Sequence, residues 1–211
     1  MTPELIAYKR LPNWTIETIP ESILHQHNTK AGTWAHLTIL SGKLAFDVLD
    51  ETGQVLSSYT FDPDSTIPFV EPQVWHKVRP LSQDIQFYLT FYCQPQDYFK
   101  KKYDLASTHS EVFKYQNLFS GKKVLDLGAG SGRNALYLAQ QGCTVTALDQ
   151  NDLALSRLNT IAQAENLNLT IDNYDINTAS LTNRYDVILS TVVFMFLQKD
   201  HIANIRLPAK L

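Results

Sequence analysis

The sequence predicts two regions of different fold class, an all-β barrel or jelly roll followed by an α/β domain on a parallel sheet. Short β patterns separated by turns run from Trp14 to Cys93, and evenly spaced short strands are typical of barrels and jelly rolls. Strand and helix patterns alternate after residue 111, which indicates parallel β-α-β units. A glycine turn follows the apolar run that starts at Val124. We therefore expect a β domain at 1–93, a linker and lid segment at 94–110, and an α/β domain at 111–211.

The composition narrows the class of protein and its partners. The chain has 211 residues, 44% of them hydrophobic, and its 18 basic and 21 acidic residues give a formal net charge of -3. Nucleic acids and anionic membranes attract strongly basic surfaces, so neither is an expected partner. No apolar run approaches about 20 residues and the first residues lack a signal-peptide pattern, so we expect a cytoplasmic protein. Cys93 and Cys143 lie in apolar strand patterns and are expected to be reduced packing residues.

The β region is expected to consist of antiparallel hairpins. Trp34–Leu40 and Lys43–Leu49 flank the turn Ser41-Gly42, which predicts the first hairpin. A second turn at Asp50–Gly53 leads into a strand over 54–61, and prolines separate this strand from a last one over 84–93.

Three histidines of this region could hold a metal ion. His25 and His27 are two residues apart and would share one face of a strand, while His76 follows a turn farther along the chain. The pattern resembles that of the cupins, although residues 31–34 stand where a glutamate is expected after the second histidine. The three histidines could therefore serve in packing or hydrogen bonding instead of metal binding, and our prediction names no metal.

The linker carries prolines and a lysine cluster between Gln94 and Lys102. After it, Thr108 and Glu111 have the spacing of a capping box, so Thr108 is expected to cap a short helix that runs into Val112.

The glycine turn is the most informative motif of the chain. A dinucleotide site is disfavoured because Arg133 stands where the third glycine of G-x-G-x-x-G belongs. Backbone amides of such a turn can bind an anion at the helix N-terminus, and Asp126 lies two residues before Gly128. S-Adenosylmethionine carries a carboxylate that suits the amides and an ammonium that suits Asp126, whereas this acid would repel a pyrophosphate. The turn therefore favours S-adenosylmethionine.

A second acid is expected at the end of the next strand. Residues 133–141 are predicted to form a helix that stops at Gly142, and 143–148 a buried strand that delivers Asp149. An acid about 20 residues after the turn can accept both hydroxyls of an adenosine ribose. Beyond it we expect a helix over 153–162, a third strand over 167–171 with Tyr174–Ile176 at its exit, and a fourth strand over 185–193 beside the first.

These motifs resemble the class I S-adenosylmethionine-dependent methyltransferases, whose first motif has the form of Leu125–Gly132. Shorter pieces are similar to the tellurite-resistance methyltransferases, namely 98–105, 108–112, 132–134 and 189–197. The resemblance covers about Tyr98 to Leu197 and implies a Rossmann-like fold. The first part of the chain also looks like the small β-barrel domain that some members carry ahead of the enzyme.

The resemblance implies cofactor-binding residues around the turn and the strand ends. They are Tyr98, Tyr103, Asp126, Gly128, Ala129, Gly130, Arg133, Asn134, Asp149, Gln150, Asp175, Ile176, Thr191 and Val192. Tyr98 and Tyr103 would fold over the methionine part as a lid, or pack on the sheet. Asp175 would accept from the adenine amino group, or form an Asx turn. Arg133 is the catalytic candidate: it could hold a substrate oxyanion, bind the cofactor carboxylate or lie on the helix surface.

The implied reaction is transfer of the sulfonium methyl group to a small acceptor such as tellurite or selenite. A class I sheet normally continues with three more strands, whereas this sequence stops soon after Leu197. We therefore expect a truncated chain with an incomplete sheet, whose exposed edge could pair in a homodimer. Two alternatives to a methyltransferase remain open. The chain could be a non-catalytic remnant that binds the cofactor, or its β region could bind a small ligand or a metal.

Overall fold

The computed structural model describes residues 4–176, 181, 183–191 and 193. The chain divides into two compact units, Met1–Tyr98 and Phe99–Leu211. The division falls inside the segment 94–110 that the sequence assigns to the linker and lid. That segment is partly helical, because it contains a 3-10 turn at Pro95–Asp97 and the helix α2 at Tyr98–Tyr103.

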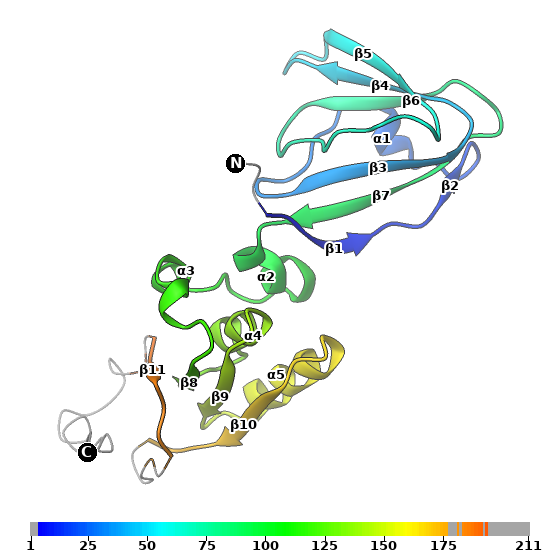
Figure 1. Cartoon of the computed structure of the whole chain (residues 1–211). Coiled ribbons are helices and arrows are strands. Elements are labelled where there is room, and N and C mark those ends of the chain that lie inside the picture. Colours follow the sequence, from blue (N-terminus) through cyan, green and yellow to red (C-terminus); the bar gives the residue numbers. More distant parts are fainter. Residues whose placement is uncertain (1–3, 177–180, 182, 192, 194–211) are drawn as a thin grey trace. The chain divides into compact units, whose positions relative to one another are not determined.

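The first unit contains two antiparallel sheets, visible as two layers in Figure 1. In one sheet β7 pairs with β1, β2 and β3, and in the other β4 lies between β5 and β6. The elements are β1 (Ile6–Arg10), β2 (Trp14–Thr15), the short helix α1 (Glu21–Leu24), β3 (Trp34–Ser41), β4 (Leu44–Leu49), β5 (Val55–Phe61), β6 (His76–Pro80) and β7 (Gln86–Cys93).

The two sheets face each other across one apolar core. Both contribute to it, because alternate side chains of a strand point to the same face. The buried members are Trp14, Leu37, Ile39, Leu44, Phe46, Val78, Ile85 and Phe87. The Trp14 and Phe87 rings meet edge to face with centroids 5.5 Å apart, a favoured arrangement for aromatic pairs.

The predicted hairpin between 34–40 and 43–49 is wrong. Its two strands exist, but β3 pairs with β7 while β4 pairs with β5 and β6. A register shift between Ile39 and Ser41 disrupts the end of β3, and such bulges bend a strand. The chain therefore passes from one sheet to the other at this corner. The second predicted hairpin, between β4 and β5, is confirmed.

The second unit contains a parallel sheet with the strand order β10-β9-β8-β11. Its elements are α3 (Ser110–Lys114), the 3-10 turn Gln116–Leu118, β8 (Lys123–Leu127), α4 (Arg133–Gln140), β9 (Thr144–Asp149), α5 (Asp152–Ala164), β10 (Leu169–Asn173) and β11 (Val187–Leu189). The helices α4 and α5 join consecutive strands that step in one direction across the sheet. Right-handed crossovers therefore place both helices on the same face.

Most sequence predictions for this unit hold, with small shifts. The helix after the glycine turn begins at Arg133 as expected, and the strand beside the first is β11, which pairs with β8 in parallel. The third strand begins two residues later than predicted, at Leu169, and the fourth is shorter. Cys93 and Cys143 are buried and form no disulfide bond. Within the described ranges, no helix is long and apolar enough to span a membrane.

The predicted capping box is wrong by one residue. The N-cap of α3 is His109, whose ring accepts a hydrogen bond from the Glu111 backbone amide. The Thr108 hydroxyl instead donates to the carbonyl of Arg133, 3.3 Å away. Because the imidazole takes over the cap, Thr108 ties the segment before α3 to the first turn of α4.

Candidate functional site

The glycine turn connects β8 to α4 at the carboxyl edge of the sheet. Its start is fixed by two backbone hydrogen bonds, in which the amides of Gly128 and Ala129 donate to the carbonyl of Leu148 over 2.7 and 3.0 Å. Leu148 lies in β9, so the turn is anchored to the neighbouring strand. Ligands of open parallel sheets bind at this carboxyl edge, where the strand order changes direction.

Glycine occupies two positions of the turn for different physical reasons. At Gly128 an added Cβ would lie 2.0 Å from a methyl group of Val193, so packing alone requires glycine there. At Gly130 φ is +55° and an added Cβ would meet no described atom within 4 Å. The positive φ, rather than packing, therefore explains Gly130, and the absence of a side chain leaves room for a ligand to approach the backbone.

Asp149 is brought directly to this turn. Its carboxylate accepts a hydrogen bond from the Gly130 amide over 2.7 Å and one from the Asn151 amide over 2.9 Å. Each carboxylate oxygen retains acceptor capacity after one such bond. The second acid and the glycine turn, which are 19 residues apart, thus form one polar cluster.

Asp126 is the most unusual side chain of the site. It is 1% exposed, and neither carboxylate oxygen has a hydrogen-bond partner among the described residues. Burial raises the pKa of this carboxyl to about 7, against the opposing effects of the Ala135 amide and the Arg133 guanidinium. A buried carboxylate normally has a partner, so Asp126 suits a cationic group that arrives with a ligand.

The exit of β10 lies beside Asp149. The Tyr174 amide donates to the Asp149 carbonyl over 3.0 Å, and the Asn173 side chain donates to the Gln150 carbonyl over 3.3 Å. Asp175 follows directly. Ile176 instead packs against the apolar cluster of Leu125, Leu127 and Leu148.

Asn134 has a role that the sequence did not predict. It is 2% exposed, its side-chain oxygen accepts from the His109 amide over 3.0 Å, and its nitrogen donates to the Thr191 hydroxyl over 3.1 Å. Thr191 stands just beyond β11. Asn134 therefore clamps the segment before α3 and the end of β11 onto α4. Val192, which the sequence also predicts to bind the cofactor, lies outside the described residues.

The Tyr103 hydroxyl makes its hydrogen bond away from the glycine turn. The Tyr103 hydroxyl donates to the Glu165 carboxylate, at the opposite end of α5 from Asp152. At about 1.5 Å per residue the two ends of this helix are roughly 18 Å apart. Tyr98 is the last residue of the first unit and is 5% exposed.

One polar group near the site escaped the sequence prediction. Ser190 follows β11 at the carboxyl edge, and its hydroxyl oxygen is buried without a hydrogen-bond partner among the described residues. Its position after the fourth strand was the available signal, but a single serine at a strand end does not by itself indicate a ligand.

In the first unit the structure brings together two of the three histidines. His27 and His76 have ring centroids 4.2 Å apart, while His25 is exposed and pairs with Glu21 at 3.7 Å. The Nδ1 atoms of His27 and His76 lie 2.9 and 2.7 Å from backbone carbonyls. Burial lowers the pKa of His76 to about 4. The part of the chain that the structure describes contains no group of three or more metal-ligating side chains.

The residues of the carboxyl edge fit S-adenosylmethionine. The unpartnered Asp126 carboxylate suits its ammonium, the open space at Gly130 suits its close approach, and Asp149 can accept from ribose hydroxyls. The Arg133 guanidinium, at the first position of α4, has no hydrogen bond or ion pair to another described residue. It can therefore bind an anion.

Comparison with known proteins agrees with this geometry. A family model described as tellurite resistance protein TehB matches residues 91–209, and one described as TehB-like domain matches 9–89. The first match extends beyond Leu197, where the sequence resemblance ended.

The curated relatives include a probable S-adenosyl-L-methionine-dependent methyltransferase TehB of Haemophilus influenzae. It is 48% identical over 205 residues, which are 97% of this chain and 72% of the relative. A protein of Eikenella corrodens named hemagglutinin 1 is 41% identical over 157 residues, covering 74% of this chain and 52% of that protein.

A crystal structure of TehB from Haemophilus influenzae superposes with a TM-score of 0.93 at 48% identity, covering 96% of this chain and 71% of that one. The predicted Rossmann-like class I fold of the second unit is thereby confirmed. The chain belongs to the TehB family of S-adenosylmethionine-dependent methyltransferases.

Proposed function

We propose that the chain binds S-adenosylmethionine across the carboxyl edge of its parallel sheet and transfers the methyl group to a small chalcogen oxyanion such as tellurite or selenite. The observation that carries the proposal is the convergence of Asp126, Gly130 and Asp149. Asp126 is a buried acid without a hydrogen bond to a described residue, and it lies just before the turn that contains Gly130. The backbone amide of Gly130 in turn donates a hydrogen bond to the second acid, Asp149.

Each group has a distinct task in this proposal. Asp126 holds the ammonium of the methionine part, the amides of the turn hold its carboxylate, and Asp149 accepts from the ribose. Asp175, which follows Tyr174 beside Asp149, accepts from the adenine amino group. Charge complementarity supports these assignments, because a carboxylate binds cations and N–H or O–H donors, while backbone amides bind anions.

Arg133 is proposed to hold the oxyanion or the cofactor carboxylate. Its guanidinium forms no salt bridge with a described carboxylate and acts on Asp126 only through space, and a guanidinium binds planar and tetrahedral oxyanions through two donors at once. When bound, the cofactor supplies a sulfonium methyl group that reacts by direct displacement. The chain then needs no covalent nucleophile, and its contribution is to align acceptor and methyl group.

We also propose that residues 1–93 form a cupin-like domain and that 94–110 close over the cofactor. The second idea is supported by the bonds from Thr108 to Arg133 and from His109 to Asn134, which hold the end of this segment at the first turn of α4. A lid role for Tyr98 and Tyr103 receives no such support.

The first test is calorimetric titration of the chain with S-adenosylmethionine. The wild type should bind saturably, and Asp149→Asn should weaken binding by about tenfold, because hydrogen bonds to a charged acceptor contribute about 1.5–3 kcal/mol. Asp172→Asn is the matched control, since Asp172 is an exposed acid of the neighbouring strand β10. Equal affinity of the two variants would contradict the assignment of Asp149.

The second test separates binding from turnover. Transfer of a labelled methyl group from the cofactor to selenite should be lost in Arg133→Gln if the arginine holds the oxyanion. Unchanged cofactor affinity together with lost transfer supports the oxyanion role, whereas loss of both assigns Arg133 to the cofactor carboxylate.

A further inference from the structure

The first unit contains a cavity that the methyltransferase function does not use. Its volume is about 480 Å³, within the range of about 300–1,000 Å³ that is typical of sites for small molecules. β3, β4 and β5 supply one part of its wall, and residues 66–71 and Val74 supply the other. The cavity lies entirely within one compact unit.

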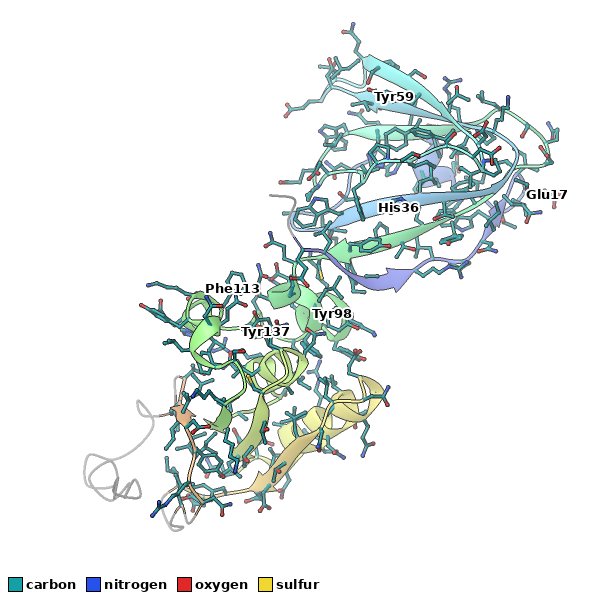
Figure 2. All side chains as sticks on the ribbon, viewed as in Figure 1. Glu17, His36, Tyr59, Tyr98, Phe113 and Tyr137 are labelled. Atoms are coloured by element: carbon teal, nitrogen blue, oxygen red, sulfur yellow. The ribbon has the colours of Figure 1, made fainter. Side chains whose placement is uncertain are left out.

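The segment 62–75 forms the roof of this cavity and is held at several points. Val70 exchanges two backbone hydrogen bonds with Ala35, over 2.8 and 3.1 Å. The His36 ring contacts the carbonyl of Ile67 at 3.2 Å. Figure 2 shows His36 on β3 and Tyr59 on β5. Because the roof is fixed to β3, the cavity is a formed feature of the unit.

The lining is mostly apolar, and four of its twelve residues are aromatic. Phe46, Tyr59, Phe61 and Phe69 all line the cavity. Two of these large apolar side chains remain exposed, Tyr59 at 51% and Phe69 at 39%. Exposed aromatic residues that surround a concave surface are characteristic of binding sites.

Glu71 gives the cavity a charge preference. It is the one charged side chain among the lining residues. Glu71 is exposed, and its carboxylate accepts a hydrogen bond from the Trp34 indole over 2.6 Å, which fixes its orientation but leaves its charge unneutralised. No ion pair joins Glu71 to a basic side chain in the described part of the chain. The combination of aromatic faces and a carboxylate attracts organic cations and repels organic anions.

We propose that this cavity binds a small protonated amine, with its hydrocarbon part against Phe46, Phe61 and Phe69 and its ammonium at Glu71. The site is separate from the proposed methyl-transfer site and does not depend on it. The occupant is a compact organic cation, because an anion would meet Glu71 and a polar neutral molecule would find few partners in the lining.

Three probes of matched size test the proposal on the whole chain: benzylammonium, benzyl alcohol and benzoate. Calorimetry gives their affinities, and the indole N–H resonance of Trp34 in 15N-labelled protein reports occupancy beside Glu71. Benzylammonium should bind saturably and shift this resonance, benzyl alcohol should bind about tenfold more weakly because it cannot form the charged hydrogen bond to Glu71, and benzoate should not bind because its charge is repelled.

Glu71→Gln keeps the size of the side chain and removes its charge. It should weaken benzylammonium binding about tenfold and leave benzyl alcohol unchanged. Glu51→Gln, at an exposed turn of the same unit away from the lining, is the matched control and should change neither. Equal affinity for benzylammonium and benzyl alcohol would overturn the cation preference. Absence of a saturable Trp34 shift with any probe would overturn the site itself.

Discussion

Two carboxylates, one in each unit, are almost equally buried but have opposite surroundings. Asp47 on β4 is 2% exposed, and Asp126 at the end of β8 is 1% exposed. Asp47 accepts from the Arg79 guanidinium over 2.7 and 3.2 Å and from Ser58 over 2.6 Å. Neither oxygen of Asp126 makes a hydrogen bond of normal geometry with a described residue, and only the nearby Ala135 amide and Arg133 guanidinium favour its charge.

The pKa values of the two carboxyl groups shift in opposite directions because of these surroundings. Hydrogen bonds from Arg79 lower the pKa of Asp47 despite its burial, whereas burial raises the pKa of Asp126 to about 7. The first arrangement satisfies a buried charge within the fold. The second leaves a buried charge unsatisfied, which the fold tolerates at a cost in stability. Unpaired buried groups of this kind mark sites where a ligand completes the structure.

The largest expected effect of this contrast is the pH dependence of stability. The pKa of Asp126 is raised above its value of 3.8 in the unfolded chain, so its contribution is fully present below about pH 4 and is lost as pH rises to about 7. Relative to Asp126→Asn, the wild type should lose about 3 kcal/mol of unfolding free energy between about pH 5 and pH 8.

Urea unfolding of both proteins at these two pH values measures this difference. Added S-adenosylmethionine should reduce the wild-type loss, because its ammonium stabilises the ionised carboxylate. Parallel pH profiles for the two proteins would show that Asp126 is ionised alike in the folded and unfolded states.

The next effect is removal of the partner of Asp47. Arg79→Ala leaves a buried carboxylate without its guanidinium and should cost about 2 kcal/mol, below the 3–5 kcal/mol of fully buried pairs because the Arg79 side chain is 50% exposed. Thermal unfolding of the chain measures the loss. Arg10→Ala is the control, since Arg10 contacts Asn13 and Tyr88 at the surface. A similar loss of stability in both variants would show that the buried Asp47–Arg79 pair contributes no more than a surface contact.

A smaller effect is expected at Asn134, a buried polar side chain whose oxygen and nitrogen each make one hydrogen bond. Asn134→Ala removes the bonds to His109 and Thr191 and should cost about 1.5 kcal/mol. Cofactor affinity should fall as well, because the end of β11 loses its attachment to α4. Asn159→Ala, at an exposed position of α5, should change neither quantity. If affinity stays constant while stability falls, Asn134 supports the fold but not the site.

The smallest effect is expected at Tyr103. Tyr103→Phe removes one hydrogen bond to Glu165 and should cost less than about 1 kcal/mol. Cofactor affinity should not change, because the hydroxyl lies at the far end of α5 from Asp149. A marked loss in a calorimetric titration would restore the lid hypothesis for this tyrosine.

The sequence predicted the local elements around the site well. Asp126 and Gly128 were recognised because an apolar run, an acid and a glycine turn are consecutive in the chain. Asp149 followed from the length of one helix and one strand, and the structure places its carboxylate 2.7 Å from the Gly130 amide. Such short-range sequence patterns predict positions in the structure reliably, because helix and strand geometry fixes where the ends of these elements lie.

The predictions that failed all concern side-chain or strand partners distant in the sequence. The hairpin of β3 with β4 failed because β3 found its partner in β7, about 50 residues away by the pairing of Leu37 with Leu89. Thr108 was expected to cap its own helix, but its hydroxyl found the carbonyl of Arg133. A short motif cannot reveal which of several possible acceptors will lie nearest.

The sequence by itself determined the two fold classes, the glycine turn, the two acids and the family. The tertiary structure alone decided that Asp126 is buried without a hydrogen bond to a described residue, that Asn134 is a clamp, that Tyr103 bonds to Glu165, and that the rings of His27 and His76 meet. The physical reason is that burial and pairing depend on which distant segments meet, and the contacts of Asn134, Tyr103 and His76 join residues that lie far apart in the sequence.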